Sequence, residues 1–355
     1  MGEARQDGGK ALVVGATGIV GGAMLDHLVR APGWEVVAAS RRPPEGRTDV
    51  AWLPLDLLDP VDCRSKIAGC PGLTHVFFAA YAKAPDAAAE VAVNLPMLTN
   101  LLDALEAGAP DLRHVQLVHG QKWYGSHLGP YRTPAREDDP RHMPPNFYYD
   151  QQDALVRRRS GKPWSWSAVR PQAPLTFSLG SPMNQLLVVA LYGSICRELG
   201  LPLDFPGKPG CFQALYQVTD PGLLARAMEH VATVPQAADQ AFNVTNGDLF
   251  RWVNLWPRLA AFFGVPAGRV RPMALARVMA DKGPLWRRMV SAHGLAPHAM
   301  ADLVDWAWGD FVFGSEHDNV SSLTRLRAAG FHEHIDSEQL YLQKLQELRS
   351  ARVIP

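Results

Sequence analysis

The first half of the chain alternates short apolar runs with longer stretches of helical periodicity. The apolar runs predict strands at residues 10–15, 34–40, 50–55, 75–81, 114–120 and 165–170. Residues with helical spacing lie between them, at 19–30, about 87–107 and 148–159. Apolar strands that alternate with helices are typical of a parallel sheet covered on both faces. Right-handed crossovers then favour a Rossmann-type, doubly wound α/β fold.

The pattern loosens in the second half of the chain. Helices are predicted at residues 182–199, 302–308 and 338–349, and a short strand at 241–244. We therefore expect two closely packed domains, a Rossmann domain at residues 9–175 and a smaller, mainly helical part at 176–355. The chain is expected to cross back to the sheet near 211–220 and 241–244. Residues 125–145, rich in Gly, Pro, Arg and Asp, are predicted to form a long functional loop.

A glycine-rich turn joins the first predicted strand to the first predicted helix, with the sequence Gly15-Ala16-Thr17-Gly18-Ile19-Val20-Gly21. Gly15 allows a tight turn, Gly18 lets the backbone approach a pyrophosphate, and Gly21 lets the helix lie close to the strand. The N–H groups at the start of the helix then face the anion. The spacing GxxGxxG, in place of GxGxxG, is typical of short-chain dehydrogenases, so this domain is predicted to bind a dinucleotide.

The residues after the second strand bear on the choice between NAD and NADP. An enzyme that prefers NAD usually places Asp or Glu there, whereas this chain has Ser40-Arg41-Arg42. Two guanidinium groups suit a 2′-phosphate and predict NADPH. Asp56 is placed to accept a hydrogen bond from the adenine amino group. The predicted cofactor-binding residues are Gly15, Thr17, Gly18, Ile19, Val20, Gly21, Ser40, Arg41, Arg42, Asp56, Leu57, Ala79, Ala80 and Tyr81.

Composition argues against several other classes of function. The chain has 35 Lys plus Arg and 35 Asp plus Glu, so no net charge favours nucleic acid or an anionic membrane as a partner. Four scattered cysteines suggest no disulfide framework, and His332-x-His334 and Glu316-His317-Asp318 match no metal-binding pattern. No signal peptide or apolar stretch of membrane-spanning length is apparent, so we expect a soluble, cytoplasmic protein without a metal.

The usual catalytic motif of short-chain dehydrogenases, Tyr-x-x-x-Lys on the helix after the fifth strand, is absent. That helix begins Asn146-Phe147-Tyr148-Tyr149-Asp150-Gln151-Gln152-Asp153, and neither tyrosine is followed four residues later by lysine. A lysine lies instead after the fifth strand, in His119-Gly120-Gln121-Lys122-Trp123-Tyr124.

With these two segments, the chain resembles the progesterone 5β-reductase/iridoid synthase-like (PRISE) family, atypical extended short-chain dehydrogenases/reductases. Its motifs Thr-Gly-x-Lys-His-Tyr and Asn-Phe-Tyr-Tyr-x-x-Glu-Asp match residues 119–124 and 146–153, and Lys122 and Tyr148 fall on the family's catalytic lysine and tyrosine. The resemblance covers nearly the whole chain. It includes Glu137-Asp138 with Pro140-Arg141, Val169-Arg170-Pro171, Ala241-Phe242-Asn243-Val244 with Asn246-Gly247-Asp248, Trp308-Gly309-Asp310 and Val353-Ile354-Pro355.

The resemblance implies NADPH-dependent 1,4-reduction of the C=C bond in an α,β-unsaturated carbonyl compound, an enone or enal. Hydride adds to the β-carbon, and negative charge develops on the carbonyl oxygen as an enolate. Tyr148 is expected to donate a hydrogen bond to that oxygen. Lys122 is expected to lower the pKa of the phenol and to stabilise the charge. Tyr149 is the alternative donor if the register differs by one residue.

The chain departs from the family motifs at three positions: His119 replaces Thr, Trp123 replaces His, and Gln152 replaces Glu. The segment between Lys122 and Tyr148 is also shorter than in plant members. These changes bear on the substrate more than on the reaction.

The resemblance also predicts the substrate pocket. Tyr81, Tyr131 and Trp308 align with its aromatic wall, with Met183 as a further candidate, and aromatic walls suit a flat, hydrophobic substrate. A small unsaturated carbonyl compound is therefore the expected partner, and a homodimer is expected from the fold class alone.

Three alternatives remain open at this point. The same tyrosine and lysine would stabilise an alkoxide if hydride added to the carbonyl carbon, as in a ketone or aldehyde reductase. A sugar-nucleotide epimerase is disfavoured because Tyr-x-x-x-Lys is absent. A non-catalytic NADP(H)-sensing protein on the same fold would need neither Tyr148 nor Lys122.

Overall fold

The computed structural model describes residues 8–44, 47–178 and 183–355, which form two compact units. Within these ranges, the first unit contains the chain up to Gln172, then Pro221–Val244 and Ser322–Glu333. The second contains Ala173–Asp220, Thr245–Ser321 and His334–Pro355. The chain leaves the first unit after Gln172, and two later segments return to it.

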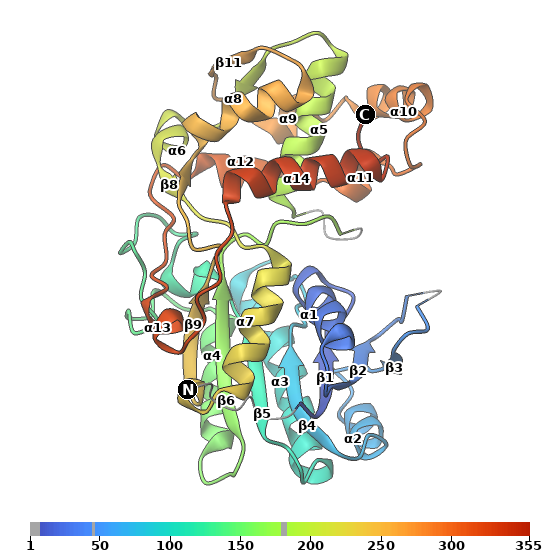
Figure 1. Ribbon diagram of the computed structural model, residues 1–355, viewed down its shortest axis with the longest axis vertical. Helices are drawn as coiled ribbons and strands as arrows, with labels where there is room; N and C mark the ends of the chain where they lie inside the picture. Colours follow the sequence, from blue (N-terminus) through green and yellow to red (C-terminus); the bar gives the residue numbers. More distant parts are fainter. Residues whose placement is uncertain (1–7, 45–46, 179–182) are drawn as a thin grey trace. The chain divides into compact units, whose positions relative to one another are not determined.

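A seven-stranded parallel sheet, in the order β3-β2-β1-β4-β5-β6-β9, forms the centre of the first unit (Figure 1). The central strands β1, β4, β5 and β6 are largely buried, which explains their near-continuous apolar sequences, whereas the edge strand β3 is partly exposed. The predicted Rossmann-type α/β fold is therefore confirmed. The strands are β1 Lys10–Val14, β2 Glu35–Ser40, β3 Ala51–Pro54, β4 Leu73–Phe78, β5 His114–Val118, β6 Ser165–Pro171 and β9 Gln240–Val244.

Helices pack on both faces of this sheet. Helix α1 (Ile19–Arg30) packs against α7 (Pro221–Thr233), and α3 (Ala87–Gly108) packs between α2 (Pro60–Ala68) and α4 (Phe147–Arg159). The short helix α13 (Thr324–Ala328) contacts β9 (Figure 1). The short helical turns η1 (Gln121–Tyr124) and η2 (Pro235–Ala237) complete the unit.

The second unit is mainly helical, as expected. Its helix α5 (Gln185–Glu198) is buried on all sides along residues 185–196, which is why its sequence is almost uniformly apolar. Around it lie α6 Pro209–Gln213, α8 Trp252–Phe263, α9 Leu275–Val278, α10 Gly283–Ala292, α11 Met300–Leu303, α12 Trp306–Gly314 and α14 Ser337–Ser350. Two small sheets pair β7 (Leu203–Phe205) with β11 (Ala267–Val270) and β8 (Leu215–Tyr216) with β10 (Phe250–Arg251).

The chain re-enters the first unit at Pro221, and the segment Pro221–Val244 carries α7 and β9. Residues 241–244 lie in β9, at the edge of the large sheet. Residues 211–220, in contrast, stay in the second unit, where β8 pairs antiparallel with β10. The apolar residues of 211–220 pack in the hydrophobic core of the second unit. There Tyr216 contacts Phe250, with ring centroids 5.8 Å apart.

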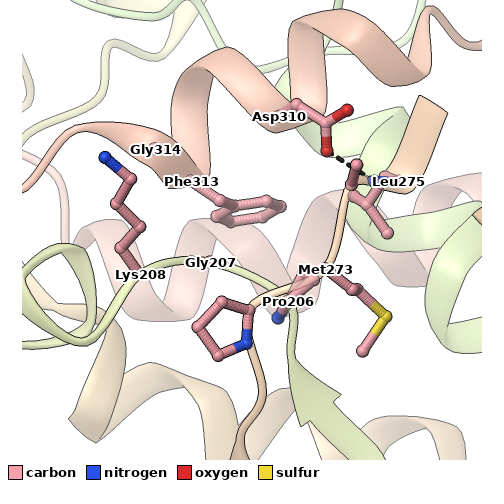
Figure 2. Close-up of a pocket in the computed structure, with 10 residues that line it drawn as sticks. Pro206, Gly207, Lys208, Met273, Leu275, Asp310, Phe313 and Gly314 are labelled. Carbon is pink, nitrogen blue, oxygen red and sulfur yellow. Dashed lines mark hydrogen bonds between the residues drawn. The ribbon is translucent and has the colours of Figure 1, made fainter. Parts of the chain in front are cut away.

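A hollow of about 370 Å³ lies in the second unit, between α12 and the segments after β7 and β11 (Figure 2). Its polar side chains are engaged within the protein. The Asp310 carboxylate accepts hydrogen bonds from the N–H groups of Leu275 (2.5 Å) and Ala276 (3.0 Å), the first two residues of α9. Lys208 pairs with Glu316 at 3.5 Å. The hollow therefore offers a mostly apolar surface and no free reactive group among its polar side chains.

Candidate functional site

The glycine turn has the shape that the sequence predicted, and two of its glycines are required by close contacts. Gly15 adopts a positive φ of 79°, and a side chain there would meet the backbone of Ala79 and Ala80 at 2.7–2.9 Å. A side chain on Gly21 would lie 2.2 Å from the Gly15 oxygen. Gly18 has more space, since its nearest contact would be at 3.4 Å. No contact with the described residues requires glycine at position 18, and the absent side chain leaves the outer side of the turn open.

The start of α1 is electrostatically prepared for an anion. Gly18 is the N-cap, no side chain caps the helix, and its first turn contains no acidic residue. The free N–H groups and the helix dipole are therefore left to face an external acceptor. The adjacent loops follow the carboxyl ends of β2, β3 and β4, where nucleotides bind in open α/β sheets.

A cavity of about 290 Å³ adjoins this turn and is lined by Thr17, Ser40, Arg41 and Arg42. Both arginines are exposed, and neither forms an ion pair with a residue that the structure describes. The buried hydroxyl of Ser40 also lacks a partner within that part of the chain. Donors without protein acceptors around one cavity are suited to a phosphate group.

The remaining predicted cofactor residues lie in the loops of the same edge. Asp56 is exposed after β3, and its carboxylate accepts from the Leu58 N–H at 3.0 Å. Leu57 is buried, and its carbonyl accepts from Asn100 at 2.9 Å. Ala79 and Ala80 pack against Gly15, as described above.

The candidate catalytic residues come from η1 and the first turn of α4. The chain leaves β5 at His119, whose N–H donates to the Val169 carbonyl at 2.8 Å, and then turns through η1, which carries Lys122. A side chain on Gly120 would lie 3.2 Å from the Tyr148 hydroxyl oxygen. Glycine at this position therefore leaves the tyrosine hydroxyl accessible from the η1 side. Among the described residues, neither the Tyr148 hydroxyl nor the Lys122 ammonium has a hydrogen-bond partner.

Tyr149, the alternative donor, has a different environment. It is only 5% exposed, and its hydroxyl donates to the Trp123 carbonyl at 2.6 Å and accepts from the His142 N–H at 2.9 Å. This hydroxyl is therefore fully used inside the protein. The two adjacent tyrosines are distinguished by geometry, and Tyr148 is the one whose hydroxyl is unengaged.

The electrostatics of Tyr148 are dominated by burial. Burial, and after it the Glu90 carboxylate, raise the pKa of Tyr148 well above its usual value. Lys122 is not among the described groups that shift this pKa in the structure, so its influence on the phenol stays a prediction, and the net direction is upward. The phenol consequently stays protonated near neutral pH and acts as a hydrogen-bond donor.

A continuous row of rings holds the Tyr148 side chain. His119 contacts one side, with centroids 4.9 Å apart, and Phe147 contacts another at 4.4 Å. Trp123 stacks on His119 at 5.4 Å and 13°, so two of the departures from the family motif touch each other. Tyr81 stacks on Phe147 at 5.5 Å, which brings a predicted pocket residue to the end of the row.

The predicted pocket residues are distributed over both units. Tyr81 is 44% exposed, and its hydroxyl donates to Glu90, so this wall is more polar than expected. Tyr131 stacks on Tyr124 at 6.4 Å and packs, like Tyr148, against the cluster around Trp123. Met183, just before α5, and Trp308, on α12, belong to the second unit, and their place in a pocket stays a prediction.

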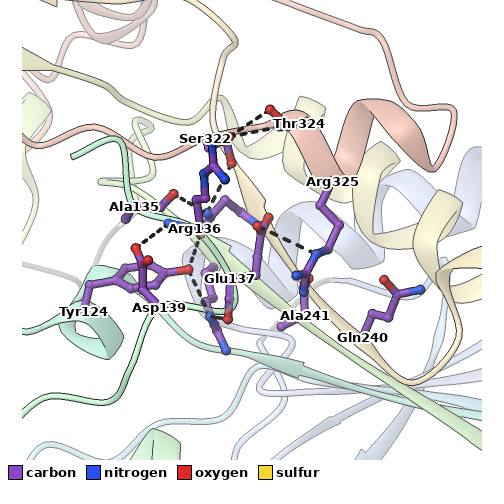
Figure 3. A network of polar contacts seen from close by, with 12 residues as sticks. Tyr124, Ala135, Arg136, Glu137, Asp139, Gln240, Ala241, Ser322, Thr324 and Arg325 are labelled. Carbon is purple, nitrogen blue, oxygen red and sulfur yellow. Dashed lines mark hydrogen bonds and ion pairs between the residues drawn. The ribbon is translucent and has the colours of Figure 1, made fainter. Parts of the chain in front are cut away.

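A buried polar network joins η1 to β6, to β9 and to the loop that contains Glu137 (Figure 3). Its members lie in several of the segments that resemble the family. Arg170 is 1% exposed and donates to the Tyr124 hydroxyl (2.9 Å) and to the Glu137 carbonyl (3.1 Å). Its guanidinium lies 3.7 Å from the centre of the Trp123 ring. Asn243 accepts from the Tyr124 hydroxyl at 2.7 Å, and its N–H donates to the Glu137 carboxylate at 2.8 Å.

These hydrogen-bonding roles were not predicted, although the segments that contain the residues match the family. The segments around Glu137, Arg170 and Asn243 were noted as parts of the family resemblance, without a reason for their presence. The network ties the loop after η1 to β6 and β9, and so supports the turn that carries Lys122. Gln152 also joins it, since its side-chain oxygen accepts from Arg170 at 3.3 Å.

Neither a metal site nor a membrane span was found in the described ranges. No group of three or more His, Cys, Asp or Glu side chains there could hold a metal ion. The four cysteines are free and buried. No helix in these ranges combines the length and the apolar character needed to cross a bilayer.

Comparison with known proteins identifies related chains of nearly full length. Short chain dehydrogenase gsfE of Penicillium aethiopicum is 33% identical over 97% of this chain and 99% of its own length. (S)-8-oxocitronellyl enol synthase ISY1 of Nepeta cataria is 32% identical over 97% of this chain and 93% of its own. The 3-oxo-Delta(4,5)-steroid 5-beta-reductase of Arabidopsis thaliana is 31% identical over the same shares.

Solved structures confirm the fold. A putative epimerase from Burkholderia cenocepacia J2315 aligns over 96% of this chain and 98% of its own, with a TM-score of 0.69 and 18% identity. The structure of RMD from Pseudomonas aeruginosa complexed with NADPH aligns over 96% of this chain and 99% of its own, with a TM-score of 0.65 and 16% identity.

The family itself is established by sequence. The model of the PRISE-like Rossmann-fold domain matches residues 57–355, which include η1, α4 and the whole polar network. Together with relatives above 30% identity over 97% of its length, this match shows that the chain belongs to the PRISE-like Rossmann-fold family.

Proposed function

We propose that this protein is an NADPH-dependent enone or enal reductase, which reduces the C=C bond of an α,β-unsaturated carbonyl compound. The named relatives support this reaction, because a 3-oxo-Δ4,5-steroid is itself an enone and one relative is named as its reductase. Other relatives are named as enol synthases, and an enol is the product that forms when an enolate takes up a proton on oxygen.

One observation carries the proposal: the Tyr148 hydroxyl has no partner among the described residues and lies next to Gly120, in surroundings that raise the pKa of the phenol. A neutral phenol in this state is a hydrogen-bond donor for an oxygen that gains negative charge. Because Tyr148 is held between His119 and Phe147, its hydroxyl is oriented before the substrate binds. Such a donor loses little free energy to reorganisation during the reaction.

The chain's own residues have distinct parts in the reaction. Bound NADPH supplies the hydride. Tyr148 donates a hydrogen bond to the carbonyl oxygen of the substrate, which strengthens as the oxygen becomes an enolate. The Lys122 ammonium, which has no carboxylate partner in the described ranges, stabilises the same negative charge. Water protonates the α-carbon. Tyr81 and Tyr131, both of the first unit, are proposed to contact a hydrophobic substrate.

The cofactor site fits NADPH. The uncapped start of α1 suits the pyrophosphate, and the cavity lined by Arg41 and Arg42 suits the 2′-phosphate. Among the residues that the structure describes, no acidic side chain lines that cavity to accept from a ribose 2′-hydroxyl, as an NAD site would require.

A ketone or aldehyde reductase is the second candidate, because the same donor pair would stabilise an alkoxide. A non-catalytic NADP(H) sensor is the third. The Tyr148 hydroxyl, which has no partner among the described residues, argues against the sensor, since a sensor needs no hydrogen-bond donor for a substrate oxygen.

The experiment that tests the proposal follows NADPH oxidation with a panel of enones, enals and the matching saturated ketones, and identifies products by mass and NMR. Saturated carbonyl products support C=C reduction. Alcohol products would favour the carbonyl reductase with the same residues. Tight NADPH binding without turnover of any panel member would favour the sensor.

A further inference from the structure

The first turn of α4 forms two side-chain hydrogen bonds with η1, the turn that carries Lys122. The Asn146 side-chain amide donates to the Lys122 carbonyl at 2.9 Å. The Tyr149 hydroxyl donates to the next carbonyl, that of Trp123, at 2.6 Å. Tyr148 lies between these two residues in sequence, so both neighbouring bonds act on the segment that presents its hydroxyl.

Asn146 connects the two candidate catalytic residues through a single side chain. Its other side-chain atom, Oδ1, accepts from the Tyr148 N–H at 3.1 Å and so forms the N-cap of α4. One end of the amide therefore holds the backbone of Tyr148, and the other end holds the backbone of Lys122. Asn146 and Tyr149 are both buried, so neither bond is readily replaced by a bond to water.

The turn itself has few bonds of its own. Within η1, the Trp123 N–H donates to the Gly120 carbonyl at 3.0 Å, and the Gly125 N–H donates to the Lys122 carbonyl at 3.2 Å. A turn of four residues with such bonds is weakly stable alone. Its position therefore depends on outside groups: the polar network holds it at Tyr124, and the groups of α4 hold it at Lys122 and Trp123.

We propose that Asn146 and Tyr149 are positioning residues that set the location of Lys122 relative to Tyr148. This inference rests on the proposed function, since it concerns the same reaction. A small displacement of either group weakens the stabilisation of the enolate, because that interaction depends steeply on distance. Neither residue touches the substrate in this mechanism, so both act through the backbone of η1.

The test removes each bond separately. Asn146→Ser keeps a short oxygen that can cap α4 but loses the amide donor to Lys122. Asn146→Asp, a second variant, also keeps the acceptor and suits a helix start. Tyr149→Phe removes one hydroxyl and keeps the ring. We expect each variant to lower kcat by about tenfold, and Asn146→Ser combined with Tyr149→Phe to lower it by about 100-fold.

A matched control separates positioning from a general loss of packing. The Tyr192 hydroxyl is also buried and donates to a backbone carbonyl, that of Asp204, at 3.0 Å, but it lies in the second unit. Tyr192→Phe should therefore lower the melting temperature about as much as Tyr149→Phe and leave kcat unchanged. The dissociation constant for NADPH should stay the same in all variants, and KM for the enone should change less than kcat.

The outcomes separate the two proposals. If the wild-type protein reduces enones and the Asn146 and Tyr149 variants, measured well below their melting temperatures, keep wild-type kcat, the positioning inference is wrong and the proposed function stands. Equal losses of kcat in Tyr192→Phe and Tyr149→Phe would also overturn it. A wild-type protein that reduces no member of the panel would overturn the proposed function and this inference together.

Discussion

Tyr148 and Tyr149 show how two adjacent residues of the same type acquire different roles. The helical turn points them in different directions, so one hydroxyl reaches the Trp123 carbonyl and the other lies beside Gly120. Burial without a partner raises the pKa of Tyr148 and keeps its proton in place. The difference lies in the surroundings, because the chemical groups are identical.

Tyr148→Phe removes the proposed donor and should lower kcat by about 100-fold or more, which is typical for the loss of an oxyanion-stabilising group. Steady-state kinetics with the best enone of the panel measures this effect. NADPH binding, measured by fluorescence titration, should be unchanged because Tyr148 is not in the phosphate-binding turn. Turnover at the wild-type rate would show that another group stabilises the enolate.

Arg41 and Arg42 should determine the preference for NADPH over NADH. Their replacement together by alanine removes the guanidinium groups from the cavity after β2 and should weaken NADPH binding by at least tenfold, with little effect on NADH. Calorimetric titration with both cofactors gives the two constants. Equal losses for NADPH and NADH would mean that neither arginine contacts the 2′-phosphate.

At the scale of elements, the contact between α1 and the glycine turn depends on one missing side chain. Gly21→Ala would place a carbon 2.2 Å from the Gly15 oxygen, so the turn or the helix must move. We expect this variant to have a lower melting temperature and at least tenfold weaker NADPH binding. Both quantities can be measured on the same purified protein.

Gly22→Ala is the matched control for this prediction. The added carbon would lie 3.4 Å from the Ala16 oxygen, an ordinary contact. Because alanine favours a helix over glycine by up to about 1 kcal/mol, this variant should be as stable as the wild type or more stable. Similar losses in both variants would mean that α1 tolerates no added side chain for a reason other than contact with Gly15.

Most elements of the first unit follow from their sequences, and the exceptions have physical reasons. Helix α2 was not predicted because its apolar side is short: Cys63 and Ile67 are its buried side chains. Helix α7 was also missed, although Leu223, Leu224, Ala227, Met228 and Val231 have helical spacing and are buried. It lies between residues 211–220 and 241–244, the two places where a return to the sheet was expected, but no helix was assigned there.

At the scale of the whole molecule, buried histidines should make stability depend on pH. His75 and His114 lie in neighbouring strands of the sheet, and burial lowers the pKa of His75 to about 4 and that of His114 to about 3. Both are therefore neutral in the folded protein between about pH 4 and pH 6.5, a range in which the histidines of the unfolded chain bind protons. Folding therefore loses stability as the pH falls from about 6.5 towards 4, by up to about 1.4 kcal/mol per pH unit for each histidine.

Urea unfolding between pH 7.5 and 5 measures this dependence. His119 and His127, whose pKa values are also lowered by burial, add to it with the same sign. A variant with glutamine in place of His75 and His114 should therefore lose less stability over this range than the wild type, although its stability at pH 7.5 is lower. An unchanged slope in that variant would show that the two histidines are not kept neutral by the fold.

The sequence by itself determined the elements whose physics is local. The apolar strands, the glycine turn and its link to α1, and the arginines after β2 could be predicted, because each depends on residues that are neighbours in the chain. The family resemblance supplied the pairing of Lys122 with Tyr148, and with it the reaction.

Tertiary structure decided what depends on distant residues. The direction of the Tyr148 pKa, the engagement of the Tyr149 hydroxyl, and the link from Asn146 to Lys122 all arise where η1 meets α4. The network around Arg170 joins residues that lie up to 119 positions apart in the chain. Burial and hydrogen-bond partners are properties of the packed chain, and only folding brings these residues together.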